Sequence, residues 1–184
     1  CGLLLLQGCT SQPADPTSAG TEPANAETAM AAVPAYESGE LADLLVAEVA
    51  AQRQAYGVTL GYYTEVAKRT GDIKVLSQAS QLAHYLEDHH QALLLSQQWL
   101  EQEPESEEAL QLAILSEIRL GNTAATTRYL DTLLGTHGEQ ALGRLVAQAR
   151  GLDAEGNLQL VQALAQLTDQ YPEQAPLWYA RALW

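Results

Sequence analysis

The side chains best suited to holding a metal ion are His84, Asp88, His89 and His90, which cluster within seven residues. On a helix, His84 and Asp88 lie four positions apart and share one face, where an imidazole and a carboxylate could ligate one ion. His89 and His90, however, fall where one helix is expected to end and the next to begin, and polar residues are ordinary at exposed junctions. We therefore interpret the cluster as solvated surface, and the sequence predicts no metal site.

A second group that could bind a charged partner is an acidic run. It places five carboxylates within eight residues: Glu101, Glu103, Glu105, Glu107 and Glu108. Carboxylates at the start of a helix are stabilised by the positive end of its dipole, so the run favours a helix that begins near Glu105. A docking patch for a basic partner is the alternative.

The sequence contains none of the short motifs that carry common catalytic chemistry. It has no Gly-rich phosphate loop, no Gly-x-Ser-x-Gly and no His-Glu-x-x-His. The formal net charge of −14 opposes binding to nucleic acid, whose phosphates require clusters of Lys and Arg. It also opposes adsorption to anionic lipid by charge alone. We therefore predict that the protein is not an enzyme and has no cofactor and no nucleic-acid partner.

The elements that must position these residues are helices, because no segment after Glu40 alternates as a strand does. Turn-like residues recur at Gly71, Pro104, Gly138 and Pro172, so the steps between them are 33, 34 and 34 residues. Such an even step is typical of stacked helix pairs. Within each interval, apolar residues return every three or four positions. We predict an all-α fold with helices at 40–54, 57–69, 72–87, 89–102, 105–120, 122–135, 139–151, 156–171 and 174–184.

Two residues have predicted places in these helices. Trp99 lies on an apolar helix face, so we expect it in the core rather than in a ligand site. Gly121 falls midway through its unit, where the turn inside a helix pair needs a residue that accepts a positive φ.

Residues 40–184 resemble tetratricopeptide repeats. When Pro104 and Pro172 are aligned with the closing proline of that family, Gly121 falls on its turn glycine. The small positions of the family fall on Ala47, Ser80 and Ala92. Three positions depart from the family pattern: Gln54 and Glu87 replace the turn glycine, and Ser96 replaces an aromatic residue. The resemblance implies a helix–turn–helix solenoid of about four repeats plus a partial fifth.

Arrays of this family bind extended peptides or partner proteins along the first helix of each repeat. If that geometry carries over, the groove is lined by polar residues off the apolar stripes. These are Lys74, Ser77, Gln81, His84 and Tyr85 in the second repeat, and Glu108, Gln111 and Arg119 in the third. Plain solvated surface is the alternative for each residue taken singly.

The start of the chain carries a targeting pattern. Residues 1–8 look like the end of an apolar secretion signal and are too short to span a bilayer, and we expect the chain to begin within that signal. A leucine run followed by Gly8-Cys9 resembles the bacterial lipoprotein signal, in which the cysteine is acylated; a chance Gly-Cys pair is the alternative. Lipidation of Cys9 would leave Cys1 in the removed part, so no disulfide is expected. Residues 9–39 are rich in Pro, Ala, Ser and Thr, which predicts a disordered tether before the array at 40–184.

The same resemblance bears on location and role. Thr10 and Ser11 follow Cys9, and in similar lipoproteins the lack of Asp there points to the periplasmic face of the outer membrane. Segments 44–53 and 60–63 resemble the first repeat of proteobacterial tetratricopeptide lipoproteins. Some of these bring substrates to carboxy-terminal processing proteases that trim cell-wall hydrolases, which implies an adaptor.

Two other functions remain open: an assembly factor (pilotin-like or an outer-membrane insertion accessory), and the non-catalytic part of a larger enzyme. The apolar last segment, 178–184, leads us to expect that the array continues past residue 184. A self-association face is the alternative for this end.

Overall fold

The structure is a computed structural model that describes residues 36–182. The helices are α1 Ser38–Gln52, α2 Tyr56–Thr70, α3 Ile73–Tyr85, α4 His89–Gln102, α5 Glu107–Arg119, α6 Thr123–Gln148, a 3-10 helix Ala149–Gly151, α7 Ala154–Gln170 and α8 Ala175–Ala182. Within residues 36–182, none of them combines the length and apolar character that a membrane crossing requires. The predicted signal remnant, Cys9 and most of the predicted tether lie outside the described residues.

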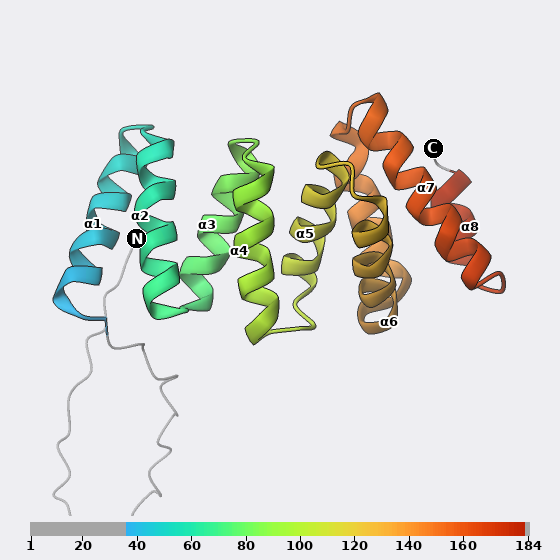
Figure 1. Cartoon of the computed structure of the whole chain (residues 1–184), viewed down its shortest axis with the longest axis horizontal. Coiled ribbons are helices and arrows are strands. Elements are labelled where there is room, and N and C mark those ends of the chain that lie inside the picture. Colours follow the sequence, from blue (N-terminus) through green and yellow to red (C-terminus); the bar gives the residue numbers. More distant parts are fainter. Residues whose placement is uncertain (1–35, 183–184) are drawn as a thin grey trace, which may run out of the picture. The chain divides into compact units, whose positions relative to one another are not determined.

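The helices of residues 36–182 follow one another in a row, and each packs against the next (Figure 1). α1 pairs with α2, α3 with α4, and α5 with the first part of α6. The part of α6 after Gly138 pairs with α7, and α8 begins a fifth pair. The all-α solenoid of four pairs and a partial fifth is therefore confirmed.

α6 comprises two helices, as predicted at 122–135 and 139–151. They meet without a loop at Gly138, whose φ is 70° and ψ is −162°, so that α6 covers both over Thr123–Gln148. Residues 149–151 are a 3-10 turn rather than the end of the α-helix. The break is thus where the sequence predicted it, but it occupies a single residue instead of a loop.

The predicted start of α5 was two residues too early. The helix begins at Glu107, not at 105, because Ser106 is its N-cap and accepts a hydrogen bond from the backbone N–H of Ala109. Pro104 therefore lies in the preceding turn rather than in the first turn of the helix. Glu107 and Glu108 are in that first turn, where the helix dipole favours them.

The turns inside the first three helix pairs share one backbone conformation. Gly121 has a φ of 75°, as predicted, and Gln54 and Glu87 both have a φ of 59° although they are not glycines. After each of these residues, a backbone N–H reaches the carbonyl five residues back: Ala55 to Ala50 at 2.9 Å, Asp88 to Ala83 at 3.0 Å and Asn122 to Glu117 at 2.9 Å. This is the hydrogen bond that closes a Schellman C-cap. The same turn conformation therefore recurs in each of these pairs, even at the two positions where a residue other than glycine occupies the turn.

The core of the described residues consists of two clusters joined at α5. One draws on α1 to α5 and the other on α5 to α8. Ten of the 13 residues of α5 are buried, so this helix contributes to both. The small positions Ala47, Ser80 and Ala92 are fully buried, and Trp99 is only 5% exposed, which confirms its predicted place in the core.

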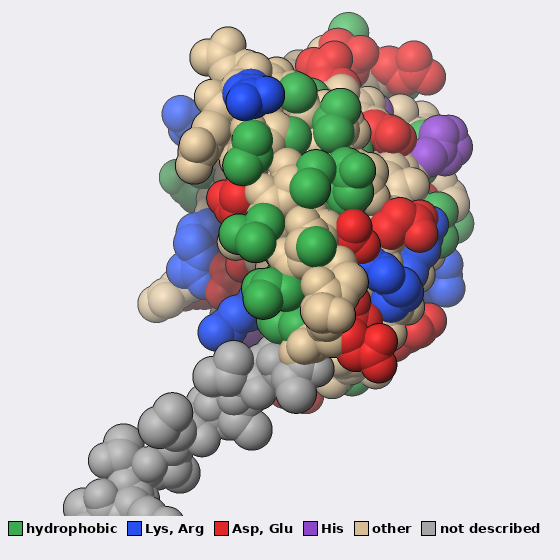
Figure 2. Space-filling model, turned by 90° about the vertical axis from the view of Figure 1, so that its left-hand side faces the viewer, with side chains coloured by type: hydrophobic (Ala, Val, Ile, Leu, Met, Phe, Trp, Pro, Cys, Tyr) green, Lys and Arg blue, Asp and Glu red, His purple; other side chains and the backbone are tan. Residues whose placement is uncertain are grey.

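The outer face of α1 is apolar. Leu41, Leu45, Val46 and Val49 are each between 42% and 60% exposed, and Figure 2 shows apolar side chains gathered on this end of the array. At the other end, Trp178 and Tyr179 of α8 are 50% and 69% exposed. Each end of the described array thus presents apolar side chains that an internal repeat would bury.

Candidate functional site

The first helices of the pairs form the candidate site. We call this surface the first-helix face; it comprises α1, α3, α5, the part of α6 after Gly138, and α8. Direct contacts join α3 to α5 and α6 to α8 without an intervening second helix. Polar bridges between neighbouring first helices and two pockets lie on this face.

The first bridge joins α3 to α5 through three of the predicted groove residues. The side-chain amide of Gln81 donates to Ser77 Oγ at 3.2 Å and also to Glu108 Oε1. Glu108 is 27 positions after Gln81 and 31 after Ser77 in the sequence, yet all three lie close together in space. Lys74, one turn before Ser77 on α3, is exposed. The structure therefore brings Ser77, Gln81 and Glu108 together at one point of the face.

The second bridge joins α5 to the later part of α6. Arg144 Nε and Nη2 donate to Glu107 Oε1 and Oε2, both at 2.7 Å, which is a bidentate pair. Gln111, another predicted groove residue, is 8% exposed and donates to Glu107 Oε1 at 2.8 Å. The hydrogen bonds from Arg144 hold the pKa of the Glu107 carboxyl below its usual value, although partial burial acts in the opposite direction.

The sequence did not single out Arg144. Arg144 lies 37 residues after Glu107, which is close to the length of one repeat. This spacing is the feature of the sequence that could have indicated that the two residues meet. His137 also lies here: its Nε2 contacts the backbone carbonyl oxygen of Glu105, and its Nδ1 is 3.9 Å from Glu107 Oε2.

The histidine cluster lies at the junction between α3 and α4. Asp88 is the N-cap of α4 and accepts from the backbone N–H of Gln91 at 3.1 Å, so its carboxylate has a structural partner. The His84 and His89 rings are 6.5 Å apart, and their Nδ1 atoms are buried without a hydrogen-bond partner among the described residues. Burial, followed by nearby charges that include Arg119, lowers the pKa of both imidazoles.

Within residues 36–182, no three His, Cys, Asp or Glu side chains are grouped so as to hold a metal ion. Arg119, the last predicted groove residue, donates from Nη2 to the carbonyl oxygen of Gly151 at 3.0 Å. Its guanidinium therefore ties the end of α5 to the turn before α7.

One pocket lies between α1, the start of α2 and the end of α3; we call it the tyrosine pocket. Its volume is about 430 Å³, within the usual range for ligand sites. Its lining includes Tyr56, Tyr63 and Tyr85, with Glu48 and Gln81 among the polar residues. Tyr85 and Gln81 are predicted groove residues, whereas nothing in the sequence analysis pointed to the other three. Tyr56, Tyr63 and Glu48 lie in the first helix pair, whereas the predicted groove residues lie in the second and third.

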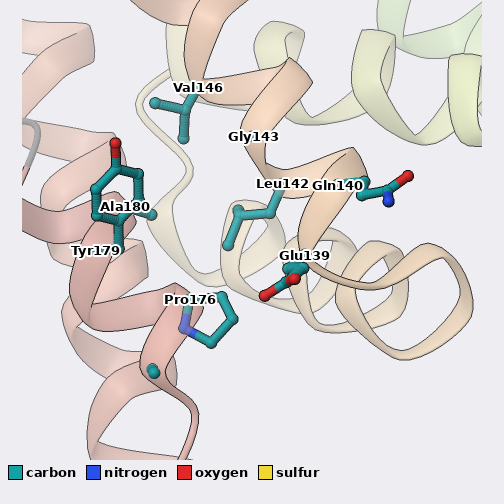
Figure 3. Close-up of a pocket in the computed structure, with 9 residues that line it drawn as sticks. Glu139, Gln140, Leu142, Gly143, Val146, Pro176, Tyr179 and Ala180 are labelled. Carbon is teal, nitrogen blue, oxygen red and sulfur yellow. The ribbon is translucent and has the colours of Figure 1, made fainter.

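A second pocket, of about 470 Å³, lies between the later part of α6 and α8. Figure 3 shows Leu142 and Val146 on α6 facing Pro176, Tyr179 and Ala180 of α8. Glu139 and Gln140 add polar groups at the edge. This second pocket is more apolar than the tyrosine pocket and belongs to the fourth and fifth repeats.

The surface therefore offers carboxylates, carboxamides, phenols and apolar hollows along a row of stacked first helices. These groups suit recognition of another chain. Cys9, the predicted lipidation residue, lies outside the described residues.

Comparison with known proteins agrees with a repeat scaffold. No family model matches the sequence. A TPR repeat-containing protein from Pseudomonas aeruginosa is 30% identical over 186 residues, and the match covers 98% of this chain but 31% of that protein. The chain thus spans about a third of the length of this relative.

A solved structure of a tetratricopeptide repeat protein from Parabacteroides merdae has the same fold. It matches with a TM-score of 0.50 at 19% identity, covering 81% of this chain and 59% of the other. Together with the helix pairs, these matches show that the chain folds as a helical solenoid of the tetratricopeptide type. Proteins built from such repeats are in general scaffolds for protein–protein interaction rather than catalysts.

Proposed function

We propose that this protein is a lipid-anchored scaffold that binds partner proteins or extended peptides along its first-helix face. The observation that carries the proposal is the surface itself. Two polar bridges and two pockets follow one row of stacked helices, so a single extended chain can contact several repeats in turn.

The proposed anchor is a pair of acyl chains on Cys9. The support is the pattern Leu6-Gln7-Gly8-Cys9 after a leucine run, together with the Pro-, Ser- and Thr-rich segment that follows it. One acyl chain alone holds a protein at a membrane only weakly, whereas several chains hold it stably. Thr10 and Ser11 support the periplasmic face of the outer membrane as the location.

The proposed role is delivery of substrates to a periplasmic carboxy-terminal processing protease, with cell-wall hydrolases as the substrates. Its support is the likeness of segments 44–53 and 60–63 to the first repeat of lipoproteins with that role. A scaffold of this kind needs separate surfaces for the protease and the substrate. The first-helix face and the apolar outer face of α1 are two such surfaces.

The experiment that tests the anchor compares the natural chain with Cys9→Ser in cells supplied with an alkyne-tagged fatty acid. We expect the tag on the natural chain only, and recovery of that chain with outer membranes. Equal tagging of both chains would contradict acylation at Cys9. Release of the variant alone into the periplasmic fraction would support the tether.

The experiment that tests the role is affinity capture of the intact protein from detergent-solubilised envelopes, read by mass spectrometry. A processing protease recovered together with cell-wall hydrolases supports the adaptor. Secretin or barrel-assembly subunits in their place would overturn it and favour the assembly factor.

A further inference from the structure

The tyrosine pocket contains an aromatic corner that the fold does not require. The rings of Tyr56 and Tyr85 meet edge to face, with centroids 5.9 Å apart and planes at 80°. Tyr85 is nevertheless 70% exposed, so most of its ring faces open space beside the pocket. A core aromatic would be enclosed, whereas most of the Tyr85 side chain is accessible and can contact a ligand.

The charge around this corner is negative. Glu48 lies on α1, and its Oε1 accepts a hydrogen bond of 2.5 Å from the Tyr63 hydroxyl. Burial and this hydrogen bond raise the pKa of Tyr63 to about 12, so the phenol stays a donor at neutral pH. The carboxylate keeps further lone pairs for another donor. A second carboxylate, Glu108, does not line the pocket but accepts a hydrogen bond from the side-chain amide of Gln81, which does.

The residues that line the pocket include no Lys or Arg. Phenol rings, one carboxylate, the apolar side chains of Ala51 and Leu82, and neutral polar side chains therefore form the walls. This combination matches a long side chain with an apolar stem and a cationic end. The stem packs on apolar wall atoms, and the cation lies over a ring face or against a carboxylate.

We propose that the tyrosine pocket binds a lysine or arginine side chain of the partner protein, with the cation between the Tyr85 ring and the Glu48 carboxylate. This inference rests on the proposed function, because it names the partner chemistry of the same first-helix face. It makes the first two repeats a selector for basic segments.

The test uses n-butylammonium as a probe of the lysine side chain and 1-pentanol as a neutral molecule of similar size. The full chain, labelled with ¹³C in its tyrosine rings, is titrated with each probe at constant ionic strength and followed by NMR. We expect the Tyr56 and Tyr85 ring signals to shift to saturation with n-butylammonium, and at least about fivefold weaker binding of 1-pentanol.

Two variants locate the effect, and a third is the control. Tyr85→Ala removes the exposed ring, and Glu48→Gln removes the charge but keeps an acceptor for Tyr63. We expect each to weaken n-butylammonium binding about fivefold or more. Leu94→Ala, which removes an exposed side chain from α4 outside the first-helix face, leaves it unchanged.

Equal binding of the two probes, or no saturable shift of these rings, would overturn the inference. So would unchanged binding by both Tyr85→Ala and Glu48→Gln. Envelope capture with the natural chain separates this failure from failure of the proposed function. If capture still recovers defined partners, the scaffold proposal is retained and only the proposed binding of a basic side chain is contradicted. If capture recovers no partners, the scaffold proposal is itself contradicted.

Discussion

Replacing Gly138 by alanine tests where the third helix pair ends and the fourth begins. The backbone there has a φ of 70° and a ψ of −162°, a region that essentially only glycine occupies. An added Cβ would meet no atom within 4 Å, so the cost comes from the backbone alone. We expect Gly138→Ala to lower the free energy of unfolding by about 1–3 kcal/mol.

Gly135→Ala is the matched control, because it lies in the same helix three residues earlier. A Cβ at position 135 also meets nothing within 4 Å, but its φ is not in the left-handed region. Alanine in place of glycine inside a helix stabilises by about 0.5–1 kcal/mol. The two variants should therefore differ by about 1.5–4 kcal/mol, with opposite signs.

The assay is urea unfolding followed by helical circular dichroism and by tryptophan fluorescence. Helix arrays can unfold in stages, so the slopes of the transitions must be compared before the free energies are subtracted. Hydrogen exchange over residues 123–148 then shows whether the loss is local to α6.

The outcome that would refute this reasoning is specific. If Gly138→Ala stabilised the protein as Gly135→Ala does, residue 138 would be helical and α6 would be straight. The later part of α6 could not then act as the first helix of a fourth pair. The pocket between the later part of α6 and α8 would then not form as described.

Three further measurements test the turns, the core and a buried charge. In the turns, Glu87→Gly should stabilise the fold by up to about 1 kcal/mol, because it removes a non-glycine residue from a left-handed conformation. Gly121→Ala should destabilise the fold by about 1–2 kcal/mol. Thermal unfolding should therefore show a higher Tm for the first variant and a lower Tm for the second. In the core, Leu145→Ala should cost about 2–5 kcal/mol because Leu145 is fully buried, whereas Leu158→Ala, at a site 55% exposed, should stay within about 0.5 kcal/mol by urea unfolding. Burial raises the pKa of Glu117, so the folded state disfavours its ionised form. Glu117→Gln should therefore increase the free energy of unfolding at pH 7. Urea unfolding at several pH values should show that this increase vanishes well below the ordinary carboxyl pKa of about 4.3.

The repeat could be predicted from the sequence because it depends on backbone punctuation. Gly71, Gly121 and Gly138 all have a positive φ; Gly71 and Gly138 lie between helix pairs, and Gly121 lies in the turn inside a pair. Gln54 and Glu87 could not be identified as turn residues from their types. They adopt the same conformation because the packing of flanking helices compels it, a tertiary effect that residue propensity does not contain.

The site was predictable only in part. Spacing along α3 placed Ser77, Gln81 and Tyr85 on one face, because helical periodicity alone decides that. The pairing of Glu107 with Arg144 depends on how two first helices approach, and the sequence does not give that distance. Glu48, on the preceding pair, was missed for the same reason.

The polar bridges also determine which charges of the first-helix face are available to a partner. Arg144 is bound bidentately to Glu107, and Arg119 donates to the carbonyl oxygen of Gly151, so both guanidinium groups already have acceptors. Glu48 has one bond, from a neutral phenol. A basic segment therefore gains a carboxylate without breaking an ion pair, whereas an acidic segment either competes with Glu107 for Arg144 or contacts Lys74, which is exposed on α3. Raising the salt concentration should accordingly weaken partner binding, and binding that strengthened with salt would contradict electrostatic selection of basic partners.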